Sequence, residues 1–96
     1  MNPRIERAVN NTQTLNLKIN VGPRYRIMKE GMRGSLWLMI QTNAFFLKLT
    51  GEVLSKLKPY MDSKVGKNLH EDQGYPVWYL PLDGTMEDIV MIFDNL

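Results

Sequence analysis

Residues 35–49 read Ser-Leu-Trp-Leu-Met-Ile-Gln-Thr-Asn-Ala-Phe-Phe-Leu-Lys-Leu, and this stretch decides the predicted fold class. On both sides of Thr42-Asn43, apolar residues recur at every second position and share one side of an extended chain. Two runs of this kind joined by a two-residue turn predict a β-hairpin. Its apolar face contains Leu36, Leu38, Ile40, Phe45, Leu47 and Leu49.

Two further strands are predicted before this hairpin. Residues 14–21 alternate in the same way until Gly22-Pro23 ends the run with a turn. Residues 24–29 alternate again, and the glycines at positions 31 and 34 indicate a second hairpin connection. The four strands form an antiparallel meander, and its apolar face requires a covering layer.

A helix after the meander is predicted to supply this cover. Thr50 is a suitable N-cap, and apolar residues recur at helical spacing between positions 53 and 61. Pro59 lies inside this pattern and is expected to kink or stop the helix near Lys58. Residues 62–74 are expected to form a polar loop.

The C-terminal third is predicted to add one strand and one helix. Residues 75–80 are typical of a strand, which Pro76 is expected to confine to the edge of the sheet. Thr85 is expected to be the N-cap of an acidic helix, with Asp88 three residues later completing a weak capping box. The apolar stripe of this helix contains Met86, Ile89, Val90 and Phe93.

The predicted fold is therefore an α+β domain: a four-stranded antiparallel meander followed by a helix, with an additional C-terminal strand and acidic helix. Residues 1–13 are polar and are interpreted as an N-terminal arm or a short helix of low stability. Residues 14–66 form the strand-and-helix core, and residues 67–96 form an acidic extension packed on the same domain. A chain of 96 residues buries a small core, which favours an oligomer over an isolated monomer.

Composition excludes several classes of protein. There is no cysteine, which excludes a disulfide framework, a thiolate metal site and a cysteine nucleophile, and is typical of a reducing compartment. The chain has no apolar window long enough for a membrane span, and its polar start is unlike a signal peptide. We therefore expect a cytoplasmic or nucleoid-associated protein without membrane contact.

Charge is distributed unevenly along the chain. All 12 Lys and Arg residues lie in residues 1–67, together with four acids, so this part carries a net charge of +8. Residues 68–96 contain six acids and no Lys or Arg. A basic body with an acidic end indicates a polyanionic partner for the body; the alternative is a solvated surface with chance asymmetry.

The second face of the meander combines cations with aromatic rings. Lysine and arginine neutralise phosphates, and flat rings stack on unpaired bases at about 1–3 kcal/mol per base. Alternatively, the C-terminal strand and helix lie across this face and make its rings part of the core. The predicted nucleic-acid-binding residues are Lys18, Arg24, Arg26, Trp37, Phe46 and Lys48, with Lys29 and Arg33 from the adjacent hairpin.

No catalytic, metal or cofactor site is predicted. His70-Glu71-Asp72 has no second histidine at ligand spacing and is interpreted as a solvated loop. Residues 31–34 lack the Lys-Ser/Thr element of a phosphate-binding loop. An enzyme is therefore not expected.

Three short motifs carry a resemblance to a known family. Residues 22–27 read Gly-Pro-Arg-Tyr-Arg-Ile, residues 32–36 read Met-Arg-Gly-Ser-Leu, and residues 49–54 read Leu-Thr-Gly-Glu-Val-Leu. They resemble the Gly-x-x-Arg-Tyr stretch, the basic hairpin and the helix start of the positive-cofactor-four family of transcriptional coactivators and single-stranded DNA-binding proteins. The resemblance covers about residues 15–62 and implies a homodimer built through the helices, with curved sheets that hold unpaired DNA. It also implies basic positions at Arg24, Lys29 and Arg33.

These observations predict a homodimeric single-stranded DNA-binding protein with little sequence preference, which the resemblance places in replication, recombination or transcription. Two alternatives use the same sheet face: a protein–protein interaction module or small regulator, and an RNA-binding protein. The acidic C-terminal helix is expected to recruit partner proteins or to shield the basic face when DNA is absent.

Overall fold

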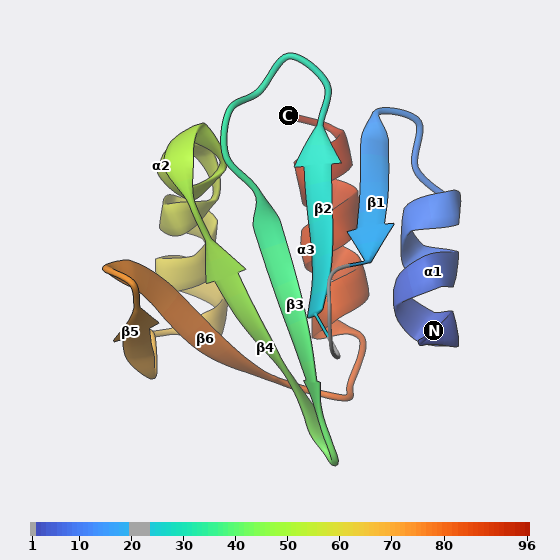
Figure 1. The fold of residues 1–96 in the computed structure, drawn as a ribbon. Helices are drawn as coiled ribbons and strands as arrows, with labels where there is room; N and C mark the ends of the chain where they lie inside the picture. The colour runs from blue at the N-terminus through green and yellow to red at the C-terminus, as the bar shows by residue number, and fades with distance from the viewer. Residues whose placement is uncertain (1, 20–23) are drawn as a thin grey trace.

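The computed structural model describes residues 2–19 and 24–96, which form one six-stranded antiparallel sheet and three α-helices (Figure 1). The order across the sheet is β1-β2-β3-β4-β6-β5. The α+β class and the four-stranded meander are confirmed, whereas the predicted turn at Gly22-Pro23 lies outside the described residues. The strands are β1 (Leu15–Ile19), β2 (Arg24–Lys29), β3 (Leu36–Gln41), β4 (Ala44–Leu49), β5 (His70–Asp72) and β6 (Tyr75–Pro81). The helices are α1 (Pro3–Asn10), α2 (Gly51–Tyr60) and α3 (Thr85–Asp94), and a π-helical segment (Met61–Val65) continues α2.

The three helices cover one face of the sheet and enclose the hydrophobic core with it. Their buried side chains form a single cluster with the apolar residues of the meander. The indole of Trp78 on β6 lies in the same core, and its Nε1 donates a hydrogen bond to the carbonyl oxygen of Gly66 at 2.8 Å. None of the helices in the described residues covers the opposite face of the sheet, and none is long and apolar enough to cross a membrane. The fully buried side chains that the helices contribute include Ile5, Val53, Leu57, Met86, Ile89 and Phe93.

The position of α3 excludes two of the predictions. α3 packs beside α1, and both helices contribute buried side chains to the core; in Figure 1, α3 lies behind the strands and α1 lies beside β1. The C-terminal helix therefore does not lie across Trp37 and Phe46, and it does not shield the basic face. Its predicted apolar stripe is confirmed, because Met86, Ile89, Val90 and Phe93 are all buried in the core.

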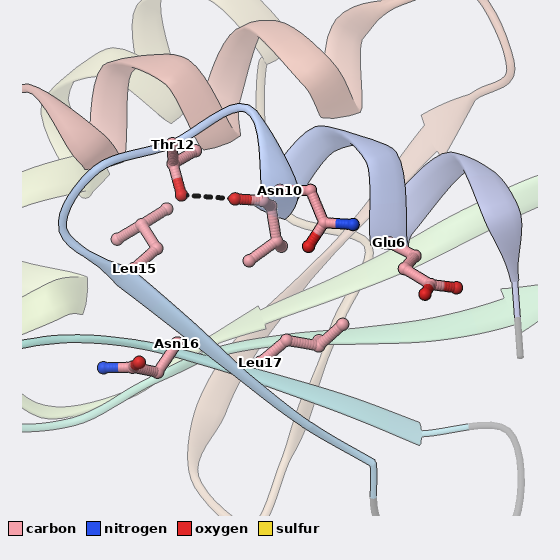
Figure 2. A pocket seen from close by; sticks show the side chains of 7 residues that line it. Glu6, Asn10, Thr12, Leu15, Asn16 and Leu17 are labelled. Atoms are coloured by element: carbon pink, nitrogen blue, oxygen red, sulfur yellow. Dashed lines mark hydrogen bonds between the residues drawn. The ribbon is translucent and has the colours of Figure 1, made fainter.

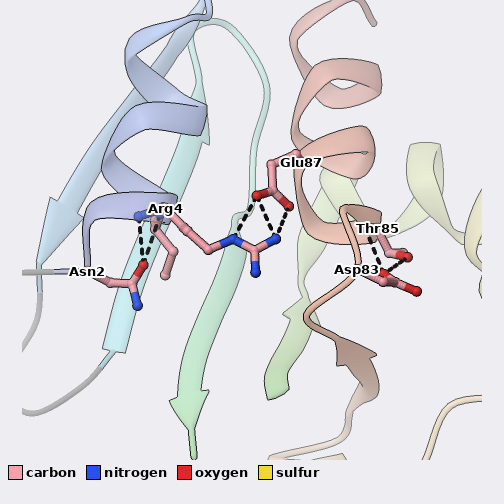
Figure 3. Close-up of polar contacts among 6 residues, drawn as sticks. Asn2, Arg4, Asp83, Thr85 and Glu87 are labelled. Carbon is pink, nitrogen blue, oxygen red and sulfur yellow. Dashed lines mark hydrogen bonds and ion pairs between the residues drawn. The ribbon is translucent and has the colours of Figure 1, made fainter. Parts of the chain in front are cut away.

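Of the two interpretations of residues 1–13, the structure has the helix. The Asn2 side chain caps α1 by accepting hydrogen bonds from the backbone N–H groups of Arg4 at 2.9 Å and Ile5 at 3.1 Å (Figure 3). Ile5 and Val9, one turn apart, enter the core, while Arg4 forms an ion pair with Glu87 of α3 at 2.8 Å. An eight-residue helix is marginal alone, so its stability comes from this packing.

Of the two predicted effects of Pro59, a stop near Lys58 is wrong, because α2 continues to Tyr60 and a π-helical segment follows it. Proline removes one backbone donor, which leaves the carbonyl group of Ser55 without its usual helical partner. Ser55 is exposed, so the missing helical hydrogen bond costs less than it would in the core. Continuing the helix past Pro59 keeps Leu57 and Met61 buried, and the winding changes from α to π at Met61.

β6 is not an edge strand, because β5 pairs with its outer side within the predicted polar loop. The carbonyl of Val77 accepts a hydrogen bond from the N–H of Leu69 at 2.8 Å, so the peptide groups of Val77 face β5. The nitrogen of Pro76 then faces the β4 side, where pairing has already ended at Val77. The missing N–H of Pro76 therefore lies where the β4–β6 pairing ends and interrupts no pairing within the ladder.

Asp83 caps α3 in place of the predicted Thr85. Gly84 occupies the N-cap position, and Oδ1 of Asp83 accepts hydrogen bonds from the N–H of Thr85 at 3.0 Å and its hydroxyl at 2.6 Å (Figure 3). The Thr85 hydroxyl bond is the main reason that the pKa of Asp83 lies below its usual value. The predicted capping box between Thr85 and Asp88 is therefore wrong.

Candidate nucleic-acid interface

The sheet side chains that point away from the helices form a surface that we name the open face. Residues directly opposite each other in neighbouring strands share a face, so the register arranges these side chains in rows. The first row contains, from β1 to β5, Lys18, Arg26, Trp37, Lys48, Val77 and His70. The second row contains, from β2 to β6, Arg24, Met39, Phe46 and Tyr79.

Trp37 lies between two cations in the first row. The guanidinium carbon of Arg26 is 5.4 Å from the centroid of its ring, and the ammonium nitrogen of Lys48 is 5.5 Å from it. Nε of Arg26 also donates a hydrogen bond to the hydroxyl of Ser35 at 2.7 Å, which restricts the guanidinium. The half-buried indole therefore lies in a positive environment, with a cation–π contact to each of these two side chains.

Phe46 and Tyr79 form the aromatic part of the second row. Their ring centroids are 5.9 Å apart with the planes at 75°, an edge-to-face contact that fixes both rings. Tyr79 is 48% exposed and was missed as a site residue. The alternation of residues 75–80 places Tyr79 on one face of a strand, but nothing in the sequence indicates that this strand pairs with that of Phe46.

A small cavity, which we name the sheet hollow, adjoins these rings. Its volume is about 190 Å³, and it is lined by Met39, Gln41, Phe46, His70 and Val77. The floor is apolar, since Met39, Phe46 and fully buried Val77 form it. Gln41 and His70 are exposed and add polar groups at the rim.

Lys48 is on the open face but is already paired with an acid. Its ammonium group lies 2.9 Å from Oδ2 of Asp72 on β5, and only 10% of its side chain is exposed. The hydrogen bond and charge of Lys48 hold the pKa of Asp72 below its usual value, and the charge of Arg24 acts in the same direction. Asp72 therefore limits the positive charge at the β5 end of the open face.

Lys29 and Arg33 lie away from the open face. Lys29 alternates in phase with Tyr25 and Ile27, and its Nζ donates hydrogen bonds on the helix side to the carbonyl oxygen of Asp94 at 2.6 Å and the hydroxyl of Thr14 at 2.8 Å. The backbone N–H of Arg33 donates to Glu52 near the start of α2 at 3.2 Å. The open face thus brings together Lys18, Arg24, Arg26, Trp37, Phe46 and Lys48 from the predicted set.

A second cavity lies elsewhere, between α1 and β1 (Figure 2). Its volume is about 480 Å³, and Glu6 and Asn10 from α1 and Leu17 from β1 contribute to its walls. The described residues that line it include an acid and no Lys or Arg, which does not suit a polyanion.

The His70-Glu71-Asp72 cluster is divided by the geometry of β5. Successive residues of a strand point to opposite faces, so His70 and Asp72 share the open face while Glu71 points away from them. In the part of the chain that the structure describes, no three His, Asp or Glu side chains converge as metal ligands.

No protein-family model, curated protein or solved structure matches this chain. The resemblance to the positive-cofactor-four family therefore remains a prediction.

Proposed function

We propose that the protein binds single-stranded DNA with little sequence preference, through the open face of its sheet. The observation that carries the proposal is the placement of half-buried Trp37 between Arg26 and Lys48 on a face that no helix covers in the described residues. Lys18 and Arg24 extend this positive surface at the β1–β2 end, and both are exposed.

The two ends of the open face suit the phosphates and the bases of single-stranded DNA, respectively. Lys18, Arg24 and Arg26 contact phosphates, and their binding releases counterions. Trp37, Phe46 and Tyr79 offer rings for stacking, at about 1–3 kcal/mol per base. Stacking does not read the hydrogen-bonding edges of bases, which is why little sequence preference is expected.

The homodimer and the cellular role are part of the same proposal. The resemblance assigns the dimer contact to the helices, where Met91 on α3 is 64% exposed, more than any other large hydrophobic residue of the described chain. A symmetric pair presents two open faces, which lengthens the strand that one particle holds. The resemblance also supports a role in replication, recombination or transcription.

Tryptophan fluorescence tests the proposal, because the two tryptophans lie on opposite faces. Trp37 is on the open face, whereas Trp78 is 1% exposed in the core. Adding an unlabelled single-stranded oligodeoxynucleotide should quench the emission, and the Trp37→Phe variant, which retains Trp78, should show no quenching. Single-stranded RNA and duplex DNA are titrated in parallel at several salt concentrations.

Each result has a defined meaning. Quenching by single-stranded DNA that weakens with salt and exceeds the duplex response supports the proposal. Stronger binding of RNA of the same sequence assigns the face to RNA instead. Absence of quenching with all three nucleic acids overturns the proposal and leaves a protein-docking role for the face.

A further inference from the structure

We propose that the sheet hollow is a subsite for one unpaired base of the bound strand; this inference rests on the proposed function. The size of the hollow fits a single base. Cavities of about 150 Å³ in protein interiors accommodate one benzene molecule. The sheet hollow, at about 190 Å³, holds one aromatic heterocycle and has no room for a stacked pair.

The lining suits a base better than a purely apolar ligand. The faces of the ring contact Met39, Phe46 and Val77, which form the floor. The Gln41 amide provides a donor and an acceptor, and the His70 imidazole provides one more polar nitrogen on the opposite rim. A base carries both donors and acceptors around a flat apolar ring, so it uses both parts of the lining.

The charges around the hollow set the direction from which the strand enters. Arg24 lies directly opposite Met39 in the register, so a cation adjoins the hollow on the β2 side. Asp72 lies on the β5 side. Its carboxylate forms an ion pair with Lys48 at 2.9 Å and repels phosphate. The sugar-phosphate backbone is therefore placed over β1 and β2, and the base points across β3 and β4 towards β5.

Phe46 connects the hollow to the stacking rings. Its ring lines the hollow and makes the edge-to-face contact with Tyr79 at 5.9 Å. A base in the hollow therefore stands beside the bases that stack on Trp37 and Tyr79. One such subsite per chain gives a modest preference among bases, since the other contacts are insensitive to sequence.

The test compares strands that differ only in their bases. Fluorescein-labelled oligothymidylate, oligodeoxyadenylate and an abasic strand of the same length are titrated by anisotropy into the full chain. The Gln41→Ala/His70→Ala variant removes the polar rim at two exposed positions. Asn10→Ala removes an exposed amide from α1, on the helix side of the sheet, and is the control.

The rim variant should lose about five- to tenfold in affinity for the better homopolymer and should keep its affinity for the abasic strand. The Asn10→Ala variant should behave as the wild type with all three oligonucleotides. A second variant, Gln41→Phe, fills the hollow with a ring and should reproduce the loss.

Two outcomes overturn the subsite. One is that the rim variant loses affinity equally for base-bearing and abasic oligonucleotides. The other is that the rim variant and Gln41→Phe both keep the wild-type preference between the two homopolymers, while DNA still quenches the emission of Trp37. Failure of the proposed function gives a different result, because the wild type then shows neither anisotropy change nor quenching with any strand, and the subsite fails with it.

Discussion

Gly34 and Gly51 lie where the β2–β3 loop passes the start of α2 at backbone contact distance. Their φ angles are +89° and +59°, in the region that favours glycine. A Cβ atom on Gly34 would overlap the carbonyl oxygen of Thr50, and one on Gly51 would lie 2.8 Å from Cα of Gly34. The backbone N–H of Ser35 donates to the Thr50 hydroxyl at 3.0 Å beside them, so this crossing fixes α2 relative to β3.

The crossing predicts a large cost for one methyl group. Gly34→Ala should lower the free energy of unfolding by about 3 kcal/mol or more, because it combines a positive φ with a backbone clash. Gly31 has a φ of +79° and no atom within 4 Å of an added Cβ. Gly31→Ala should therefore cost only about 1 kcal/mol. Urea unfolding followed by circular dichroism measures the free energy of unfolding of both variants. Equal losses would contradict the proposed role of the close backbone contact between Gly34 and Thr50.

Asp72 gives a second prediction at the scale of single residues. Asp72→Asn should free Lys48 for phosphate and raise affinity for single-stranded DNA by about three- to tenfold at low salt. Glu71→Gln makes the same change in net charge one residue away, on the other face of β5, and should change affinity less than about twofold. Thermal melting of both variants checks that the sheet stays folded without the carboxylate. A similar gain in both variants would show that net charge, and not the ion pair, is responsible.

The carboxylate of Asp94 at the end of α3 joins this helix to the start of β1. It accepts hydrogen bonds from the N–H of Thr14 at 2.8 Å and its hydroxyl at 2.5 Å, and from the N–H of Gln13 at 3.1 Å. The Thr14 hydroxyl bond is the main reason that the pKa of Asp94 lies below its usual 3.8. The contact therefore connects two elements from opposite ends of the chain.

The lowered pKa of Asp94 predicts how stability depends on pH. A carboxyl group with a lower pKa in the folded state stabilises the fold above its unfolded value, and this contribution is lost as pH falls through the folded value. The melting temperature should be nearly constant between about pH 7 and 5 and fall below about pH 4. Asp94→Asn should lower the neutral melting temperature and make the acid decrease shallower, whereas Asp62→Asn at an exposed ion pair should not. A decrease of the same size in the Asp94→Asn variant would remove Asp94 from the explanation.

α3 is part of the core, which changes the meaning of its deletion. Removing residues 82–96 takes away four buried side chains, each worth about 2 kcal/mol, from a domain with a typical stability of about 5–15 kcal/mol. The truncated chain should therefore lose its cooperative thermal transition and its binding of single-stranded DNA. Removing Leu96 alone, which is 46% exposed, should leave both intact. A folded truncated chain with increased affinity would revive the shielding hypothesis.

Local periodicity predicted the elements well, because a strand or helix shows its own buried face in its own sequence. The bounds of β2 and β4 and the stripe of α3 could all be predicted in this way. The place of a strand within the sheet could not be predicted where it depends on a partner strand far away in the sequence. The insertion of β6 between β4 and β5 requires knowing that His70–Asp72 pairs with it, and a three-residue polar strand carries no periodic signal.

Which side chains share the open face could be predicted in part for the same reason. The open face follows from alternation within β1–β4, and strict alternation also assigns Lys29 to the helix side with Tyr25 and Ile27. The ion pair of Lys48 with Asp72 and the contact of Phe46 with Tyr79 join residues more than 20 positions apart. No spacing in the sequence indicates these contacts, and they decide how many cations are free.

The basic and acidic parts of the sequence are interleaved in the folded molecule. Arg4 pairs with Glu87, Lys29 donates to the carbonyl oxygen of Asp94, and Lys48 pairs with Asp72. The +8 charge of residues 1–67 is therefore partly neutralised by residues 68–96 within the fold itself. The proposed phosphate contacts are therefore limited to Lys18, Arg24 and Arg26 on the open face, because Lys29 and Arg33 make their hydrogen bonds elsewhere.

This distribution of charge predicts the salt dependence of binding. Each phosphate contact by a single strand contributes about 0.7 to the slope of log affinity against log salt. Three cations per open face give a slope of about −2, whereas all six predicted cations would give about −4. A dimer that engages both faces doubles these values, so paired variants provide the sharper comparison. Arg24→Gln should make the slope shallower by about one third, and Arg33→Gln, the same change at an exposed arginine beside α2, should leave it unchanged. An equal effect of the two substitutions would mean that the bound DNA follows the β2–β3 loop and not the open face.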